Sequence, residues 1–220
     1  MKPDQFVSAL RELHLGSTFN PYSDRCKVHD VEDAPSRRSK ALQGMLEVAA
    51  EAEVDAVWIG RDLGYRGGRR TGFALTDDVH LSLHAMRWNI SVERATMGAV
   101  VAERTAAVVW SVLTCVTARV FLWNVFPLHP HEVDNPFTNR PHRPLERAAG
   151  EEILAELISM LRPRRLIAIG KEAIKSAQRC AGVEPVVQVR HPSYGGQRDF
   201  IQQVGCIYNL TVEVKQLELL

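Results

Sequence analysis

Apolar positions along the chain follow two recurring patterns. Apolar residues at helical spacing predict helices in residues 3–13, 40–53, 103–113, 145–161 and 171–180. Short apolar runs that end abruptly in polar sequence predict buried strands at 54–60, 120–125, 166–169 and 186–189. The stretches rich in Gly, Pro and polar residues, which predict long loops, are 15–37 and 127–144.

The order of these elements indicates an α/β fold. Strands that alternate with helices form parallel sheets with right-handed crossovers. A length of 220 residues suits one domain, which we expect to span residues 1–220. In such sheets ligands bind beyond the carboxyl ends of the strands, so the polar sequence after each strand is where a site is expected.

Composition narrows the class of protein. The formal net charge is only +1, so any contact with nucleic acid needs a local basic face. Four scattered cysteines without a C-x-x-C pair argue against a zinc finger or an iron–sulfur cluster and fit a reducing compartment. No apolar stretch approaches the roughly 20 residues that span a bilayer. We therefore expect a cytoplasmic protein with no membrane segment.

Polar sequence follows three of the predicted strands. The segments are GRDLGYRGGRRTGF at 60–73, WNVFPLHPH at 123–131 and RHPSYGG at 190–196. If the strands are neighbours, the carboxylate of Asp62, the amide of Asn124 and the imidazole of His191 converge on one crevice. Such a set can orient water, read a base edge and stabilise a departing anion.

These segments resemble, in order, motifs of the uracil-DNA glycosylase superfamily. Residues 60–73 are similar to its water-activating loop, LWNVFPLHPH at 122–131 to its base-reading strand, and HPSYGG at 191–196 to its HPS loop. LIAIGKEA at 166–173 resembles the strand and helix between the last two motifs. The resemblance covers residues 54 to 196. It implies a three-layer αβα sandwich around a central four-stranded parallel sheet.

The resemblance also implies an activity. The chain would be a monofunctional DNA glycosylase of base excision repair that flips out and hydrolyses uracil or another deaminated base. It would act on DNA containing such a base, as a monomer, and would need no metal or redox cofactor.

Individual roles follow from the matched positions. Asp62 stands where one branch carries its catalytic aspartate, and His191 would donate a hydrogen bond to the uracil O2. Asn124 would read the base edge, within a pocket that includes Gly60 and Arg61. Phe73 is the candidate for the aromatic face that stacks on the base, with Leu75 as the alternative position.

Further residues are candidates for contacts with the DNA backbone. They are Arg66, Arg69, Arg70, Ser193, Tyr194 and Gly195. Tyr194 stands where relatives place a residue that wedges into the base stack. His129, His131 and His142 share one loop, but without nearby carboxylate or Cys spacing they do not predict a metal site.

The motif after the first strand departs from the superfamily pattern in three places. Arg61 replaces the glutamate of one branch, Leu63 replaces the usual proline, and Gly64 replaces a tyrosine that excludes thymine. These differences imply that the protein acts on a wider range of bases than uracil alone. Two alternatives stay open: a relative that binds DNA without catalysis, and a nucleotide-binding α/β protein whose Gly-rich loop cradles phosphate.

Overall fold

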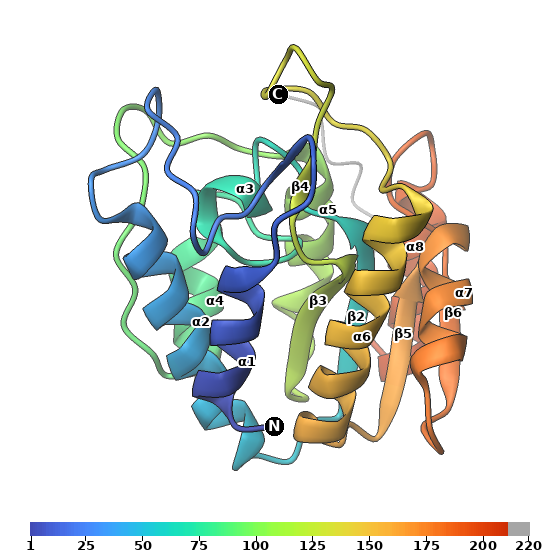
Figure 1. Ribbon diagram of the computed structural model, residues 1–220. Coiled ribbons are helices and arrows are strands. Elements are labelled where there is room, and N and C mark those ends of the chain that lie inside the picture. The colour runs from blue at the N-terminus through green and yellow to red at the C-terminus, as the bar shows by residue number, and fades with distance from the viewer. Residues whose placement is uncertain (211–220) are drawn as a thin grey trace.

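A four-stranded parallel sheet forms the centre of the molecule (Figure 1). The structure is a computed structural model that describes residues 1–210. Its strands are β2 (Ala56–Asp62), β3 (Val120–Phe126), β5 (Arg165–Ile169) and β6 (Val186–Val189), and they lie in the order β3-β2-β5-β6. All three neighbouring pairs are parallel, which confirms the predicted sheet.

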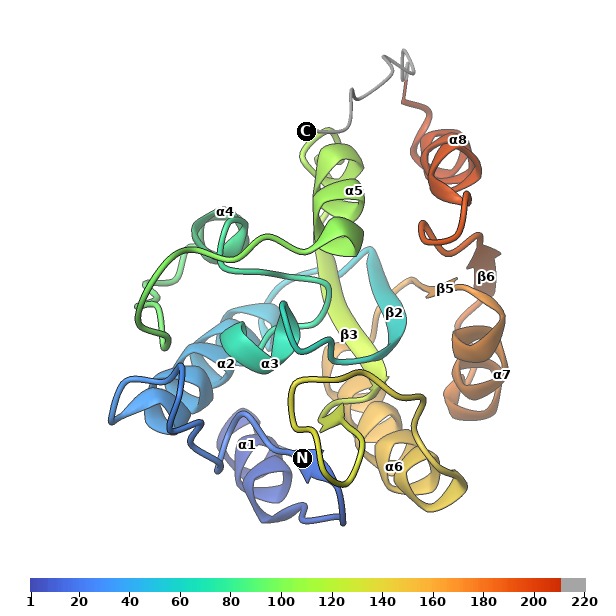
Figure 2. The ribbon, with the colours of Figure 1, turned by 90° about the horizontal axis from the view of Figure 1, so that it is seen from above.

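Helices cover both faces of this sheet (Figure 2). One face carries α1 (Pro3–Glu12), α2 (Ala34–Ala50), α6 (Pro144–Leu161) and α7 (Lys171–Cys180), and the other carries α5 (Arg104–Leu113) and α8 (Gln197–Tyr208). Side chains of β2 alternate between the two cores, with Val57 and Ile59 in one and Ala56 and Trp58 in the other. The three-layer αβα sandwich is therefore confirmed.

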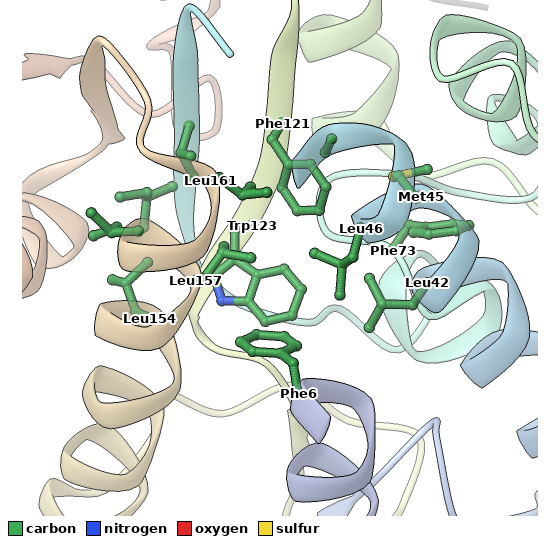
Figure 3. Close-up of a cluster of buried hydrophobic side chains, with 14 of the residues drawn as sticks. Phe6, Leu42, Met45, Leu46, Phe73, Phe121, Trp123, Leu154, Leu157 and Leu161 are labelled. Atoms are coloured by element: carbon green, nitrogen blue, oxygen red, sulfur yellow. The ribbon is translucent and has the colours of Figure 1, made fainter. Parts of the chain in front are cut away.

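The larger core is built around aromatic rings (Figure 3). The ring centroids of Phe6 in α1 and Trp123 in β3 lie 5.6 Å apart. Leu46 of α2 and Leu157 of α6 point toward the same indole from either side. These contacts fix β3, and with it the polar residues at its carboxyl end, against three helices.

Four short elements and one helix boundary differ from the sequence prediction. The predicted loop 15–37 contains β1 (Thr18–Phe19), which pairs with β4 (His129–Pro130), and α2 begins at residue 34, not 40. The helices α3 (Gly68–Thr71) and α4 (Leu81–Arg87) were not predicted either. With four and seven residues, these helices are too short to display a helical period in the sequence.

The helix α8 was also missed, although its sequence contains a signal. Its buried residues Phe200, Ile201 and Val204 have helical spacing. Of the described helices, none is long and apolar enough to span a membrane.

A buried ion pair explains why the start of α2 looks polar in sequence. The guanidinium of Arg38 faces the carboxylate of Asp30 through two hydrogen bonds, Nη2 to Oδ1 at 2.5 Å and Nη1 to Oδ2 at 2.9 Å. Both side chains are almost fully buried. The Nε of Arg38 donates to the backbone oxygen of Arg70 at 2.8 Å. The pair therefore connects α2 to the segment that follows β2.

Replacing Asp30 by Ala should destabilise the protein by about 3–5 kcal/mol, because the Arg38 charge would stay buried without a partner. Urea unfolding followed by circular dichroism measures this loss. Glu93→Ala, which removes a largely exposed partner of Arg37, is the control and should change stability little. Equal losses for the two variants would contradict the prediction.

Candidate functional site

A cavity of about 340 Å³ lies at the carboxyl ends of β2, β5 and β6. Asp62, the last residue of β2, and His191, two residues after β6, both line it. Ile169, at the end of β5, lies on the same wall. This is the edge of a parallel sheet at which ligands are expected. The structure thus brings two of the three predicted reactive groups together.

The carboxylate of Asp62 is held from two sides. His142 Nδ1 donates a hydrogen bond to Asp62 Oδ1, and Arg61 Nε donates to Asp62 Oδ2 at 2.6 Å. The side chains of Asp62 and His142 are both more than nine-tenths buried. Two donors fix the carboxylate plane, and the oxygens keep further lone pairs that can accept a proton from water.

His191 is held in one tautomer by its neighbour Ser193. The backbone N–H of Ser193 donates to His191 Nδ1 at 3.1 Å, and Ser193 Oγ lies 2.7 Å from the same nitrogen. Because Nδ1 accepts, the proton of the neutral ring resides on Nε2. The ring packs on Gly170, where any Cβ would approach within 3.1 Å of His191 Cβ. His191 therefore presents an N–H donor.

Electrostatics keep this imidazole neutral. Burial, with the positive charges of Arg61 and Arg190, lowers the pKa of His191 below its ordinary value. Arg61 thus acts on both reactive groups, since it also contacts Asp62. The imidazole of His191 is therefore a neutral hydrogen-bond donor in a cavity that is also lined by the positively charged Arg61 side chain.

Asn124 does not line the cavity. It lies on β3 opposite Gly60 of β2, and its side chain is only 1% exposed. Its Oδ1 occupies the place that a Cβ on Gly60 would need, so only glycine fits at residue 60. Neither Oδ1 nor Nδ2 forms a hydrogen bond with the residues that the structure describes. A buried amide without partners costs roughly 1–3 kcal/mol per group.

The aromatic candidate Phe73 belongs to the core. It is 3% exposed and packs among Leu42, Met45 and Leu46 of α2 (Figure 3). The prediction that it faces the base is therefore corrected, because its side chain points away from the cavity. Leu75, the alternative position, does line the cavity and lies against Gly60 beside the Asn124 amide.

Two of the predicted backbone-binding arginines are also corrected. The guanidinium of Arg69 lies 4.0 Å from the ring centroid of Phe19 and is buried. Arg70 Nη2 lies 2.8 Å from Asp78 Oδ2, with both side chains buried. A charge already neutralised or covered in this way cannot also reach phosphate. In the sequence, Arg69 and Arg70 suggest an exposed basic loop because their partners, Phe19 and Asp78, lie outside this segment.

Other candidates remain accessible. Arg66 is exposed and its Nε donates to the Tyr65 hydroxyl at 2.9 Å. Tyr194 is 97% exposed on the cavity rim, and both it and Gly195 have a positive φ. Such a raised, left-handed turn suits a side chain that projects outward. Contacts of these residues and of Ser193 with DNA stay predictions.

Several cavity residues were not predicted from the sequence, and Glu103 is the one among them whose pKa is strongly raised. Glu103, directly before α5, lines the wall, and its carboxyl lies over Gly64 and Gly67. Burial and the charge of Asp77 raise the pKa of this carboxyl to about 7, with Arg66 acting in the opposite direction. Glu103 lies outside every motif, so only its position in space identifies it.

The histidines of the 127–144 loop do not form a metal site. His129 is buried, and its Nε2 lies 2.8 Å from the backbone oxygen of Thr138. Burial lowers its pKa to about 3. Within residues 1–210, no group of three or more His, Cys, Asp or Glu side chains could hold a metal ion.

The sequence model of the family described as "Uracil DNA glycosylase superfamily" matches residues 48–203, which is most of the chain. The chain belongs to this superfamily. The matched range contains Asp62, Asn124 and His191. The members of the superfamily are DNA glycosylases, and this chain is a uracil-DNA-glycosylase-like protein.

A solved structure supports the fold of this superfamily member. The crystal structure of wild-type SMUG2 from Pedobacter heparinus matches with a TM-score of 0.61 and 14% sequence identity. The match covers 95% of this chain and 97% of that chain. At this identity the likeness concerns the fold. No curated protein matches the chain.

His142 is another residue that sequence reasoning did not assign to this site. It comes from a loop 80 residues further along the chain than Asp62, so no local pattern connects the two. Its ring also packs edge-on against Phe126, with centroids 6.3 Å apart. We expect His142 to be a positioning residue that orients the Asp62 carboxylate.

Replacing His142 by Phe should lower the turnover number about 10- to 100-fold, because a hydrogen bond to a charged group is lost. KM should change little. His142→Asn keeps an N–H donor close to the Nδ1 position and should recover most of the rate. Single-turnover and steady-state kinetics on a uracil-containing oligonucleotide measure both quantities. If the Asn variant were as slow as the Phe variant, an N–H donor at this position would not be sufficient to restore the rate, which would contradict the assigned role.

Proposed function

We propose that this protein is a monofunctional DNA N-glycosylase that releases uracil or another deaminated base from DNA. The observation that carries this proposal is the shared cavity of Asp62 and His191 at the carboxyl end of the sheet. One group is a carboxylate held in place, and the other is a neutral imidazole with its N–H available. Hydrolysis of an N-glycosidic bond requires these two functions.

The reaction begins with extrusion of the target nucleotide into the cavity. Extrusion costs a few kcal/mol and is needed because the glycosidic bond lies inside the duplex. The exposed side chains of Arg66 and Tyr194 would contact the distorted DNA. Contacts with the phosphates offset part of the cost of extrusion.

The glycosidic bond then breaks. The bond between C1′ and the base nitrogen cleaves, and its electron pair leaves with the base. Negative charge collects on the base oxygen O2, to which His191 Nε2–H donates a hydrogen bond. The nearby Arg61 cation stabilises the same charge. A water molecule adds to C1′ and gives up its proton, which Asp62 accepts.

Reading of the base by Asn124 requires a local movement. The amide is covered, and Leu75 lies beside it while lining the cavity. Leu75 has a φ of 53°, a left-handed conformation that is uncommon for a leucine and costs of order 1–3 kcal/mol. Displacement of Leu75 by the base would release this strain and satisfy the unpaired amide of Asn124.

The direct test is incubation of the protein with oligonucleotides that contain uracil, hypoxanthine or xanthine in paired, mispaired and single-stranded contexts. Base release is detected as alkali-labile strand breaks, and the free base is detected by mass spectrometry. We expect release of at least one of these bases without added metal. Absence of product in every context would overturn the proposal.

One observation favours a second candidate, a member that binds DNA without catalysis. Asn124 does not reach the cavity, so the base-reading contact is not formed in this conformation. A gel shift with uracil-containing DNA, in the absence of any base release, would support this second candidate. Base release by the wild type would exclude it.

A further inference from the structure

We propose that Glu103 is a specificity-determining residue, whose carboxyl group in its acid form donates a hydrogen bond to a carbonyl oxygen of the extruded base. The proposal rests on the proposed glycosylase function and deepens it. It assigns to Glu103 the distinction between a carbonyl oxygen and an exocyclic amine at the position of the base that Glu103 faces.

The first argument is the position of the side chain. Glu103 precedes α5 in an extended conformation, and its backbone N–H donates to Asp77 Oδ2 at 2.6 Å. This anchor directs the side chain across the segment after β2. A Cβ on Gly64 would lie 2.5 Å from Glu103 Oε1, and a Cβ on Gly67 would collide with Oε2. The carboxyl thus occupies room that exists only because both residues are glycines.

The second argument is that this carboxyl has no hydrogen-bonding or charged partner among residues 1–210. Throughout the described part of the chain, no donor bonds to Oε1 or Oε2 of Glu103, and no cation pairs with it within 4.0 Å. It is half-buried and lines the same cavity as Asp62 and His191. A cavity-lining carboxyl that no protein group engages is free to bind a polar ligand.

The surroundings favour the acid form at neutral pH. Burial and Asp77 raise the pKa of Glu103 to about 7, whereas Arg66 lowers it. Asp77 is itself bonded to His80 Nδ1 at 2.6 Å, so its charge is partly compensated. The other charged or titratable groups that line the cavity are Arg61, Asp62, Arg140, Lys171, Glu172, His191 and Tyr194. Protonation of Glu103 near pH 7 changes which groups of a base it can bind.

The chemistry of deamination makes this change useful. Deamination replaces an exocyclic amine, which donates hydrogen bonds, by a carbonyl oxygen, which accepts them. A carboxylic acid donates its O–H to that oxygen, whereas a carboxylate repels it and favours an amine. The acid form of Glu103 therefore favours a base with a carbonyl oxygen at the facing position over a base with an amine there, and ionisation of Glu103 above about pH 7 weakens that preference.

The test compares single-turnover rates of the wild type, Glu103→Gln and Glu103→Ala from pH 6 to pH 9, on each oligonucleotide that the wild type cleaves. The wild-type rate should fall about 10- to 100-fold across this range. Glu103→Gln keeps an N–H donor at every pH and should be nearly pH-independent. Glu103→Ala should be slow throughout. Glu152→Gln, an exposed change on α6, is the matched control.

The outcomes separate the two proposals. Wild-type activity with the same pH dependence in Glu103→Gln and Glu103→Ala would overturn the role of Glu103 and leave the glycosylase proposal intact. No base release by the wild type would overturn the glycosylase proposal and this inference with it. A Glu103→Gln variant that is slow at every pH would also contradict the inference, provided that its circular dichroism spectrum and DNA binding match the wild type.

Discussion

Replacing Asp62 by Asn is expected to lower the single-turnover rate of base release by about 10²- to 10⁴-fold, the range over which a positioned acid–base group contributes. The asparagine oxygen can still accept a hydrogen bond from Arg61, and its NH2 group can donate to His142 Nδ1 once the neutral imidazole changes tautomer, so the shape of the site should be kept. Its neutral amide cannot accept the proton of the attacking water. The loss should therefore appear in the chemical step.

The Asp62→Asn substitution should leave DNA binding and folding close to those of the wild type. Fluorescence anisotropy with a uracil-containing duplex should give a dissociation constant close to that of the wild type, because Asp62 is buried and makes no phosphate contact. Asp134→Asn, an exposed change in the 127–144 loop, is the matched control and should retain full activity. A rate for Asp62→Asn within a few-fold of the wild type would remove Asp62 from the mechanism.

Replacing His191 by Ala is expected to lower the rate of base release by about 10²- to 10³-fold, as loss of one donor to a developing oxyanion does elsewhere. The charge on the leaving base would then be stabilised by Arg61 alone. Since the depressed pKa keeps His191 neutral below its ordinary titration range, the wild type should keep this contribution as the pH falls through 6.5. Single-turnover rates between pH 5.5 and 7.5 measure it.

The control for this variant is His14→Ala, which changes an exposed histidine after α1. It should leave both the rate and its pH dependence unchanged. Ser193→Ala provides a finer comparison, because the backbone N–H that sets the tautomer remains while the hydroxyl is lost. It should therefore cost less than His191→Ala. A His191→Ala rate equal to that of the wild type would exclude the imidazole as the donor.

The sheet and the position of the site could be predicted from the sequence because they rest on local, periodic signals. Apolar runs such as 54–60 are buried on both faces wherever they lie in the sheet, so they are recognisable without knowledge of their neighbours. Asp62 and His191 follow such runs directly. The topology of parallel strands then requires that their carboxyl ends meet at one edge.

Residues whose role depends on partners distant in sequence could not be predicted. Arg69 and Arg70 read as a basic surface, yet Phe19 and Asp78 bury them. Phe73 reads as a stacking face, yet the turn at Gly72, with a φ of 77°, directs its side chain into the core against α2. Sequence alone shows the type of a side chain but not the direction in which a turn points it.

The sequence by itself therefore determined the αβα architecture, the superfamily motifs and the meeting of Asp62 and His191 at one edge of the sheet. Only the tertiary structure placed His142 on Asp62, Glu103 over Gly64 and Leu75 beside Asn124. The reason is physical. Periodicity encodes burial along one element, whereas the contacts that set a charge, a tautomer or a cavity wall are made between elements, and their partners leave no pattern in the neighbouring sequence.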